Sequence, residues 1–280
     1  EGKLISGCQK AYQDTSNKGE NILNVLETIA ISNFRKKPGM ILLIDFSKAF
    51  DSINHEFIYE SLNFFNFGPY FVKIVKTMLN SRKCNLMIDG YPTKQFKNLR
   101  GVPQCDTASP YIFIIVLEIP LLRIKHDPNL KFLKFNVPGF DPMDGGNLNI
   151  DPLQCFADDM TAIMEETEEN LIKMKEIFEA CKKLSGLEIN EGKTKVIRIG
   201  TNLENVTPIT EEVKFKYVTS FTLLGVEIDN KLCNLSENFG IRKKRIRQKI
   251  AIWRKLNLST IGNLIISKTF LISQLGYLLS

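Results

Sequence analysis

Three aspartates stand beside strongly apolar segments of this chain. Asp45 lies in the apolar run 40–46, which is typical of a strand buried on both faces. Asp158 and Asp159 separate the apolar segments 153–157 and 160–164, which predict a tight hairpin with both acids at its bend. A carboxylate beside apolar strands is costly unless a cation compensates it. Taken alone, the Asp-Asp pair favours a simple polar turn, and this alternative stays open.

If the three carboxylates meet, they would repel each other and favour divalent cations between them. Hard oxygen ligands of this kind suit Mg²⁺. Two such ions about 4 Å apart can activate a hydroxyl group and stabilise a leaving pyrophosphate.

The remaining pattern predicts the elements that would position these acids. Helical spacing of apolar residues, caps and Gly or Pro signals predict helices over 21–33, 55–65, 70–80, 109–124 and 168–184, the last ending near Gly186. The segments 85–88 and 94–99 around Asp89-Gly90 predict a hairpin, and 195–199 and 221–228 predict strands. Residues 138–152 predict a loop or long hairpin tip. A basic helix with an apolar stripe is expected from Asn238 onward.

The net charge of +6 is unevenly distributed. Residues 231–280 carry ten Lys or Arg and one acid, a net charge of +9, so the other 230 residues sum to −3. A basic end on a near-neutral body indicates an anionic partner, and nucleic acid or an acidic membrane surface would both fit. A solvated helix face is the plainer alternative.

Cysteine spacing and hydropathy narrow the class of protein. None of the six cysteines forms a C-x₂-C pair, which disfavours zinc and redox motifs and favours an intracellular, reducing location. No apolar run reaches the roughly 18 residues of a membrane span, so no membrane is expected. The chain begins without Met and stops inside an apolar stretch, which predicts a fragment of a longer protein.

Five segments occur in the order of the reverse transcriptase motifs. Residues 41–51 resemble the first palm motif, 101–110 the nucleotide-site loop, 156–159 the aromatic-Ala-Asp-Asp box, 186–194 the next motif and 223–226 the primer-grip hairpin. The sequences of residues 9–21, 107–110 and 241–280 resemble those of the LINE-type (non-LTR retrotransposon) group. The chain is therefore similar to that group over nearly all of its length.

The resemblance implies an α+β, right-hand polymerase whose palm is an antiparallel sheet backed by helices. It places part of the fingers at 1–37, palm at 38–58, the fingers–palm connection at 59–105, palm at 106–230 and a truncated helical thumb at 231–280. The implied function is RNA-directed DNA polymerase, a nucleotidyltransferase that extends a DNA primer on an RNA template with dNTPs. Two Mg²⁺ ions, with Mn²⁺ as a substitute, would be its only cofactor, and nuclear action is implied by the resemblance alone.

The resemblance also assigns roles to particular residues. Asp45, Asp158 and Asp159 would bind the metal ions, and Lys193 would act near the leaving pyrophosphate. Phe46, Phe50 and Gln104 would contact the nucleotide, with Phe50 as the gate against a 2′-hydroxyl; a core aromatic is the alternative for Phe50. The primer end would be held by Leu224 and Gly225, and phosphates of the duplex by Arg242, Lys243, Lys244, Arg245, Arg247 and Lys249.

Two positions depart from the family pattern. Cys105 stands where the family usually has Gly, and Ser16 stands where a basic residue is expected to hold the triphosphate. These departures favour an alternative in a different class, a catalytically weakened or inactive nucleic-acid-binding remnant of such an element. A group II intron-type enzyme or another palm polymerase is a further alternative. The Thr-Ala-Ser-Pro sequence at 107–110 and the thumb sequence disfavour it.

Overall fold

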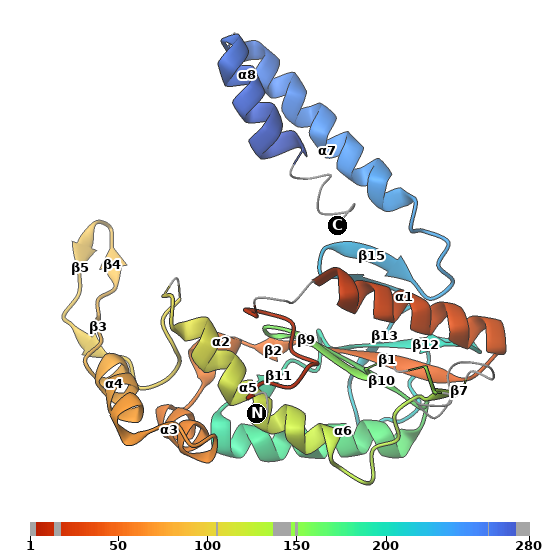
Figure 1. The fold of residues 1–280 in the computed structure, drawn as a ribbon, viewed down its shortest axis with the longest axis horizontal. Helices are drawn as coiled ribbons and strands as arrows, with labels where there is room; N and C mark the ends of the chain where they lie inside the picture. The colour runs from red at the N-terminus through yellow and green to blue at the C-terminus, as the bar shows by residue number, and fades with distance from the viewer. Residues whose placement is uncertain are drawn as a thin grey trace.

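The computed structural model describes residues 4–13, 18–104, 106–136, 147–148, 151–256 and 258–272. Helices and strands alternate along this α+β chain around one main sheet (Figure 1). None of the helices in these ranges is both long and apolar enough to cross a membrane.

The main sheet has five strands in the order β13-β12-β1-β10-β9. Their bounds are β1 Gly39–Ile44, β9 Leu153–Phe156, β10 Asp159–Met164, β12 Lys195–Ile199 and β13 Lys216–Tyr217. The pairs β12-β1, β1-β10 and β10-β9 are antiparallel, as expected, whereas the edge strand β13 runs parallel to β12. Strand β1 is therefore central, which explains why its sequence is apolar throughout.

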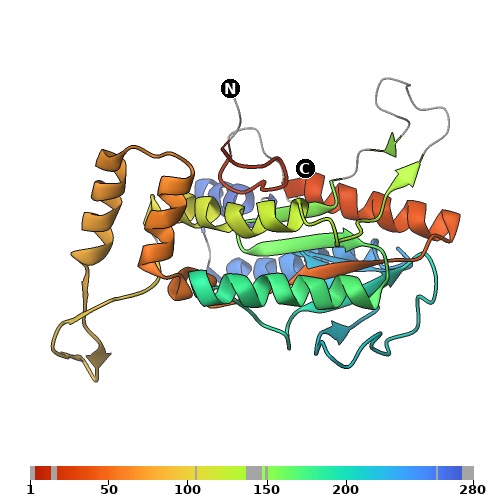
Figure 2. The same cartoon turned by 90° about the horizontal axis from the view of Figure 1, so that it is seen from below.

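Side chains alternate between the two faces of β1, and each face has its own core. Met40, Leu42 and Ile44 pack with one group of helices, whereas Ile41 packs on the opposite face. The first group comprises α3 His55–Phe64, α4 Pro69–Asn80, α5 Ser109–Lys125 and α6 Glu168–Ser185. The opposite face is covered by α1 Lys18–Arg35 and by the hairpin of β14 Ser220–Leu223 and β15 Val226–Asp229 (Figures 1 and 2).

Local signals explain where the long helices begin and end. Pro110 occupies the first turn of α5, where its missing N–H is not needed. At the start of α6 the Thr167 hydroxyl accepts a hydrogen bond from the Asn170 backbone N–H. That helix ends at Gly186, whose φ of 77° lies in the left-handed region. The predicted helix starts and stops are thus confirmed here.

The chain leaves the main sheet at Asp45. Strand β1 ends at Ile44, and the next two residues form β2 Phe46–Ser47, which pairs with β11 Glu188–Ile189 instead. A short helix, α2 Ala49–Ser52, follows. The expected single strand over 40–46 is therefore two strands with the aspartate between them.

Two other strand predictions were only partly right. The turn at Asp89-Gly90 is confirmed, but the chain returns at once as β5 Tyr91–Pro92 against β4 Met87–Ile88. The outer pair of this hairpin is β3 Lys83–Cys84 with β6 Phe96–Lys97, inside the expected 94–99. The expected strand 221–228 is the β14–β15 hairpin. Strand β7 Phe135–Asn136 precedes the expected loop 138–152 and pairs with β8 Asn147–Leu148, which lies inside it; most of this loop lies outside the described residues.

Two projections extend from the body, and both rise on the same side in Figure 1. One is the β3–β6 hairpin beyond α4. The other is a helical hairpin made of α7 Glu237–Trp253, a 3₁₀ turn Arg254–Leu256, α8 Thr260–Ile266 and a π-helical turn Ser267–Ile272. The expected basic helix is confirmed as α7. Of its apolar stripe, Ile246, Ile250 and Trp253 are half-buried and Leu256 is exposed.

Candidate active site

The two adjacent acids lie at a two-residue turn between β9 and β10. Phe156 pairs with Asp159, so Ala157 and Asp158 form the turn itself. Ala157 has a φ of 56°, which is unusual for a residue with a Cβ and costs roughly 1–2 kcal/mol. A sharp turn of this kind places both carboxylates at the end of the hairpin.

A buried glutamine holds the strained residue of this turn from both sides. The Gln9 side chain accepts a hydrogen bond from the Ala157 N–H at 3.0 Å and donates one to the Ala157 carbonyl at 3.2 Å. Its oxygen also accepts from the Ala11 N–H at 3.0 Å. Gln9 itself lies in a segment that pairs with β9 at Cys155. The N-terminal segment therefore fixes the backbone on which Asp158 stands.

The strand register brings the third aspartate to the same place. Ile44 and Met160 are the last paired residues of the antiparallel β1–β10 ladder, so Asp45, which follows β1, and Asp159, which begins β10, lie at the same end of these two strands. The three acids thus lie at one end of the main sheet, with Asp45 half-buried and Asp158 and Asp159 exposed.

The charges of the two neighbouring acids act on Asp159. The pKa of the Asp159 carboxyl is raised, first because the surrounding protein removes part of its hydration, then because Asp158 and Asp45 repel its charge. A nearby cation would reverse this repulsion, so the donor set fits a hard divalent ion. In the described ranges, however, no group of three His, Cys, Asp or Glu side chains is arranged to hold a metal ion as it stands.

The turn that carries Lys193 is fastened to the backbone of Asp45. The Asn190 N–H donates to the Asp45 carbonyl at 2.7 Å, and the Asp45 N–H donates to the Thr194 hydroxyl at 3.4 Å. Within the turn, the Lys193 N–H donates to the Asn190 carbonyl. The Lys193 side chain is exposed.

The three residues expected at the nucleotide lie around α2. Phe46 is buried and meets Phe178 edge-on, with ring centroids 5.7 Å apart. Phe50 is half-buried and stacks on Phe113 at 4.3 Å, so one face of its ring belongs to the core. The Gln104 amide donates to both carboxylate oxygens of Asp51 at 3.3 Å.

The loop that precedes Gln104 is bound to the same short helix. The Gly101 N–H donates to the Ile53 carbonyl, and the Val102 N–H donates to the Phe50 carbonyl. Gly101 has a φ of 74°, and a Cβ there would lie 2.7 Å from the Asp51 backbone. Only glycine fits at this contact. The loop at 101–104 and the segment 50–53 are consequently held together by backbone hydrogen bonds.

The expected primer-grip hairpin and the basic helix are directly connected. Leu224 and Gly225 form the two-residue β14–β15 turn, with φ values of 46° and 85°. The Arg242 guanidinium donates to the Gly225 carbonyl at 3.1 Å. The remaining expected phosphate contacts on α7 are exposed; they are Lys243, Lys244, Arg245, Arg247 and Lys249.

Some site residues lie outside the description, and others escaped sequence reasoning. Ser16 and Cys105, the two departures from the family pattern, are among the residues that the structure does not describe. Gln9 and Thr194 were not singled out from the sequence, although each supports an aspartate. Thr194 lies inside a recognised motif and could have been found there. Gln9 begins the recognised segment 9–21, but nothing in that segment distinguishes a buried amide from an exposed one.

Comparisons with known proteins bear on the family and the fold. The family model described as "Reverse transcriptase (RNA-dependent DNA polymerase)" matches residues 8–228. The "Transposon TX1 uncharacterized 149 kDa protein" of Xenopus laevis is 23% identical over 260 residues, 91% of this chain and 19% of that protein. A "Retrovirus-related Pol polyprotein from type-2 retrotransposable element R2DM" of Drosophila melanogaster is 30% identical over 110 residues, 39% of this chain and 10% of that protein. This chain thus spans about a fifth or less of these relatives.

Solved structures show the same fold at low identity. Telomerase from Candida albicans with a fragment of telomeric RNA has a TM-score of 0.53 at 12% identity, covering 80% of this chain and 34% of that one. Telomerase from Candida tropicalis with such a fragment has a TM-score of 0.51 at 13% identity, covering 78% and 34%. This similarity concerns the fold, an α+β right-hand polymerase.

Proposed function

Because this chain belongs to the reverse transcriptase (RNA-dependent DNA polymerase) family, in its non-LTR retrotransposon group, we propose that it extends a DNA primer on an RNA template with dNTPs. The observation that carries this proposal is the register of the β1–β10 ladder, whose last pair, Ile44 and Met160, brings Asp45 and Asp159 to the same end of the sheet beside the Asp158 turn. The action of the whole protein on chromosomal DNA in the nucleus is part of the same proposal.

We assign the metal ligands to Asp45, Asp158 and Asp159. Two Mg²⁺ ions, or Mn²⁺ in their place, would lower the pKa of the primer hydroxyl and stabilise charge on the leaving pyrophosphate. Burial raises the pKa of Asp159 most, and the repulsion from Asp158 and Asp45 that raises it further supports cation binding at this point. Rotation of the carboxylates toward a common point is part of the proposal, since phosphate oxygens complete such sites.

The surrounding side chains would position the nucleotide. Lys193, on the turn bonded to Asp45, would place its ammonium group near the departing phosphates and stabilise their charge. Phe46 would offer its backbone beside the triphosphate. The open face of Phe50 would exclude a 2′-hydroxyl, and Gln104 would contact the sugar and base after leaving Asp51.

The template–primer duplex would lie along the second projection. Leu224 and Gly225 would hold the primer end, since their turn faces the basic helix through the Arg242–Gly225 bond. The exposed cations of α7 would bind phosphates without reading sequence, which suits an enzyme that must move along any template. We further propose that 1–37 form part of the fingers, 38–58 and 106–230 the palm, 59–105 the fingers–palm connection, and 231–280 a truncated thumb.

Primer extension on a poly-rA template with an oligo-dT primer tests this function. We expect incorporation of dTTP with Mg²⁺ or Mn²⁺, and its loss in Asp158→Asn while duplex binding is retained. Glu211→Gln, an exposed acid outside the site, is the matched control and should keep full activity. Extension by Asp158→Asn at the control's rate would refute the metal assignment.

The same assay separates the inactive-remnant alternative. If the natural chain binds duplex but does not extend, and a Ser16→Arg, Cys105→Gly double variant does extend, the chain is a weakened copy of an active enzyme. If both extend equally, the remnant alternative is excluded.

A further inference from the structure

One of the two histidines of the chain is buried against the loop that carries Gln104. His55 is the first residue of α3 and is 8% exposed. Its Nε2 atom lies 2.9 Å from the Gly101 carbonyl oxygen. Because a carbonyl oxygen can only accept a hydrogen bond, Nε2 carries the proton and the imidazole donates. His55 therefore joins the start of α3 to the loop 101–104.

The carbonyl that His55 holds belongs to the peptide group between Gly101 and Val102. The N–H of the same peptide group, which is that of Val102, donates to the Phe50 carbonyl at 2.8 Å, so both polar ends are bonded. Gly101 has a φ of 74°, and glycine accepts many backbone conformations, so this peptide group could rotate if one bond were lost. The histidine thus restricts the residue of the loop whose backbone is intrinsically most free.

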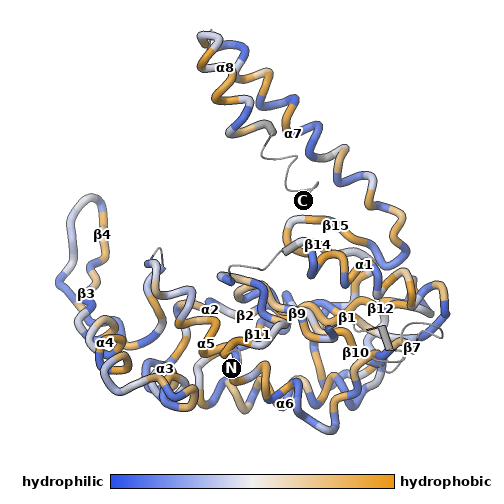
Figure 3. The backbone as a smooth tube through the Cα atoms, viewed as in Figure 1, coloured by the Kyte–Doolittle hydropathy of each residue, from blue (hydrophilic) through white to orange (hydrophobic). Residues whose placement is uncertain are grey.

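The start of α3 is itself held by the end of α6. The Asn54 N–H donates to the Ser185 carbonyl at 2.7 Å, and the Asn54 side-chain amide donates to the Leu184 carbonyl at 3.0 Å. Tyr59, one turn further along α3, lies beside the imidazole, with ring centroids 6.5 Å apart. The helix also packs against α5, which Figure 3 colours mainly as hydrophobic. His55 is consequently a fixed point from which the loop can be positioned.

The loop ends in the side chain that the proposed function places at the nucleotide. Gln104 follows Gly101 by three positions and donates to the Asp51 carboxylate. We propose that His55 is a positioning residue for the incoming nucleotide: by holding the Gly101 carbonyl, it sets the place where Gln104 meets the sugar and base. This inference rests on the proposed polymerase function. His55 acts through the loop alone, so its effect appears in nucleotide binding.

Primer extension on poly-rA with an oligo-dT primer, at varied dTTP, tests this role through three substitutions. His55→Leu and His55→Phe remove the donor, whereas His55→Gln keeps an amide N–H at the reach of Nε2. Without the donor, KM for dTTP should rise about tenfold while kcat changes by less than about twofold, because Gln104 contacts the nucleotide equally in the ground and transition states. His55→Gln should keep KM within about threefold of the natural chain's.

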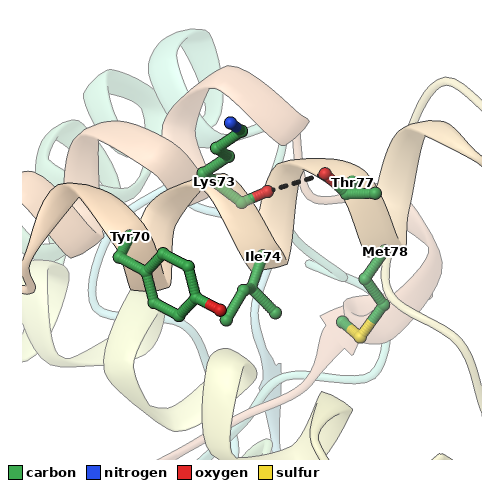
Figure 4. A pocket seen from close by; sticks show the side chains of 5 residues that line it. All are labelled: Tyr70, Lys73, Ile74, Thr77 and Met78. Atoms are coloured by element: carbon green, nitrogen blue, oxygen red, sulfur yellow. Dashed lines mark hydrogen bonds between the residues drawn. The ribbon is translucent and has the colours of Figure 1, made fainter.

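Two control substitutions remove comparable bonds elsewhere. Ser61, on the same helix, is fully buried, and its hydroxyl donates to the Phe57 carbonyl at 2.6 Å. Ser61→Ala therefore also loses a buried side-chain bond to a carbonyl, but one that does not involve the loop. On α4, Thr77→Val removes the 2.9 Å bond to the Lys73 carbonyl (Figure 4). Both controls should keep the natural KM for dTTP.

Hydrogen exchange gives a second readout that needs no polymerase activity. The amide protons of Gly101 and Val102 are bonded to the Ile53 and Phe50 carbonyls. They should exchange about tenfold faster in His55→Leu, and at the natural rate in His55→Gln and in the controls, because opening of the loop exposes them. A natural chain that extends no primer would refute the proposed function, and the exchange rates would then decide whether His55 holds the loop.

Three results would overturn the inference. One is a KM for dTTP in His55→Leu that equals that of Ser61→Ala. Another is an equal rise in KM in His55→Gln and His55→Leu, which would reduce the effect to packing of the ring. The third is unchanged hydrogen exchange at 101–102 in His55→Leu. Extension is compared at a temperature where urea unfolding shows each variant to be folded, and if His55→Leu does not fold, His55→Phe takes its place in all three comparisons.

Discussion

Replacing Gln9 by leucine tests whether the N-terminal segment sets the geometry of the carboxylate hairpin. The substitution removes three hydrogen bonds and leaves the Ala157 N–H, the Ala157 carbonyl and the Ala11 N–H without these partners. Gln9 is fully buried, so water cannot replace them freely. At about 1 kcal/mol for each bond, the free energy of unfolding should fall by about 3 kcal/mol.

The effect on catalysis should exceed the effect on folding. Without Gln9, Ala157 is no longer held at a φ of 56°, and the turn can relax toward a negative φ. A shift of about 1 Å at a reacting group can cost about 100-fold in rate. We therefore expect primer extension by Gln9→Leu to fall about 100-fold under conditions where the protein remains folded.

Gln154 provides a matched control on the same hairpin. It is also buried, but its amide makes one bond of 3.4 Å, to Asp151, and its oxygen has no hydrogen-bond partner. Gln154→Leu should lose less than about 1 kcal/mol. Urea unfolding and single-turnover extension of both variants give the comparison. Equal stability and equal rates for Gln9→Leu and Gln154→Leu would refute the idea that Gln9 fixes this turn.

Two further predictions use other parts of the site. Phe50→Ala should raise the efficiency of NTP relative to dNTP incorporation at least tenfold, at a stability cost of about 2 kcal/mol; an unchanged ratio would make Phe50 a core aromatic only. For Asp229, burial alone would raise the pKa, but the backbone N–H groups of Asn234, Cys233 and Lys231 lower it. Urea unfolding of the natural chain and Asp229→Asn should thus show a stability difference that is fully present above the unfolded pKa of about 3.9. This difference should disappear as the pH falls through the lower pKa of the folded state. A difference that does not change with pH would contradict this prediction.

The acids and the strands that carry them could be predicted because their signals are local. An apolar run that stops at Asp45 and two apolar segments flanking Asp158 follow from burial on both faces of a central sheet. The helix that ends at Gly186 follows from the conformational freedom of glycine. None of these inferences needed to know which strands are neighbours.

What sequence reasoning missed depends on contacts between distant segments. Gln9 reaches Ala157 across 148 positions, and no local pattern distinguishes it from any other glutamine. The parallel edge strand β13 has two residues, too few for a periodic signal. The turn inside 221–228 was not predicted, because an apolar residue such as Leu224 at a φ of 46° is uncommon in hairpin turns.

The departure of the chain from the main sheet at Asp45 has a consequence for engineering. Since both backbone polar groups of that residue are bonded to the segment 190–194, the acid and the lysine turn change position together. Chimeras that exchange the latter segment between related elements without the strand ending at Ile44 would carry mismatched halves of one support. Chimeras that exchange the strand before Asp45 and the segment 190–194 together should keep activity, whereas chimeras with a junction between these two segments should lose it.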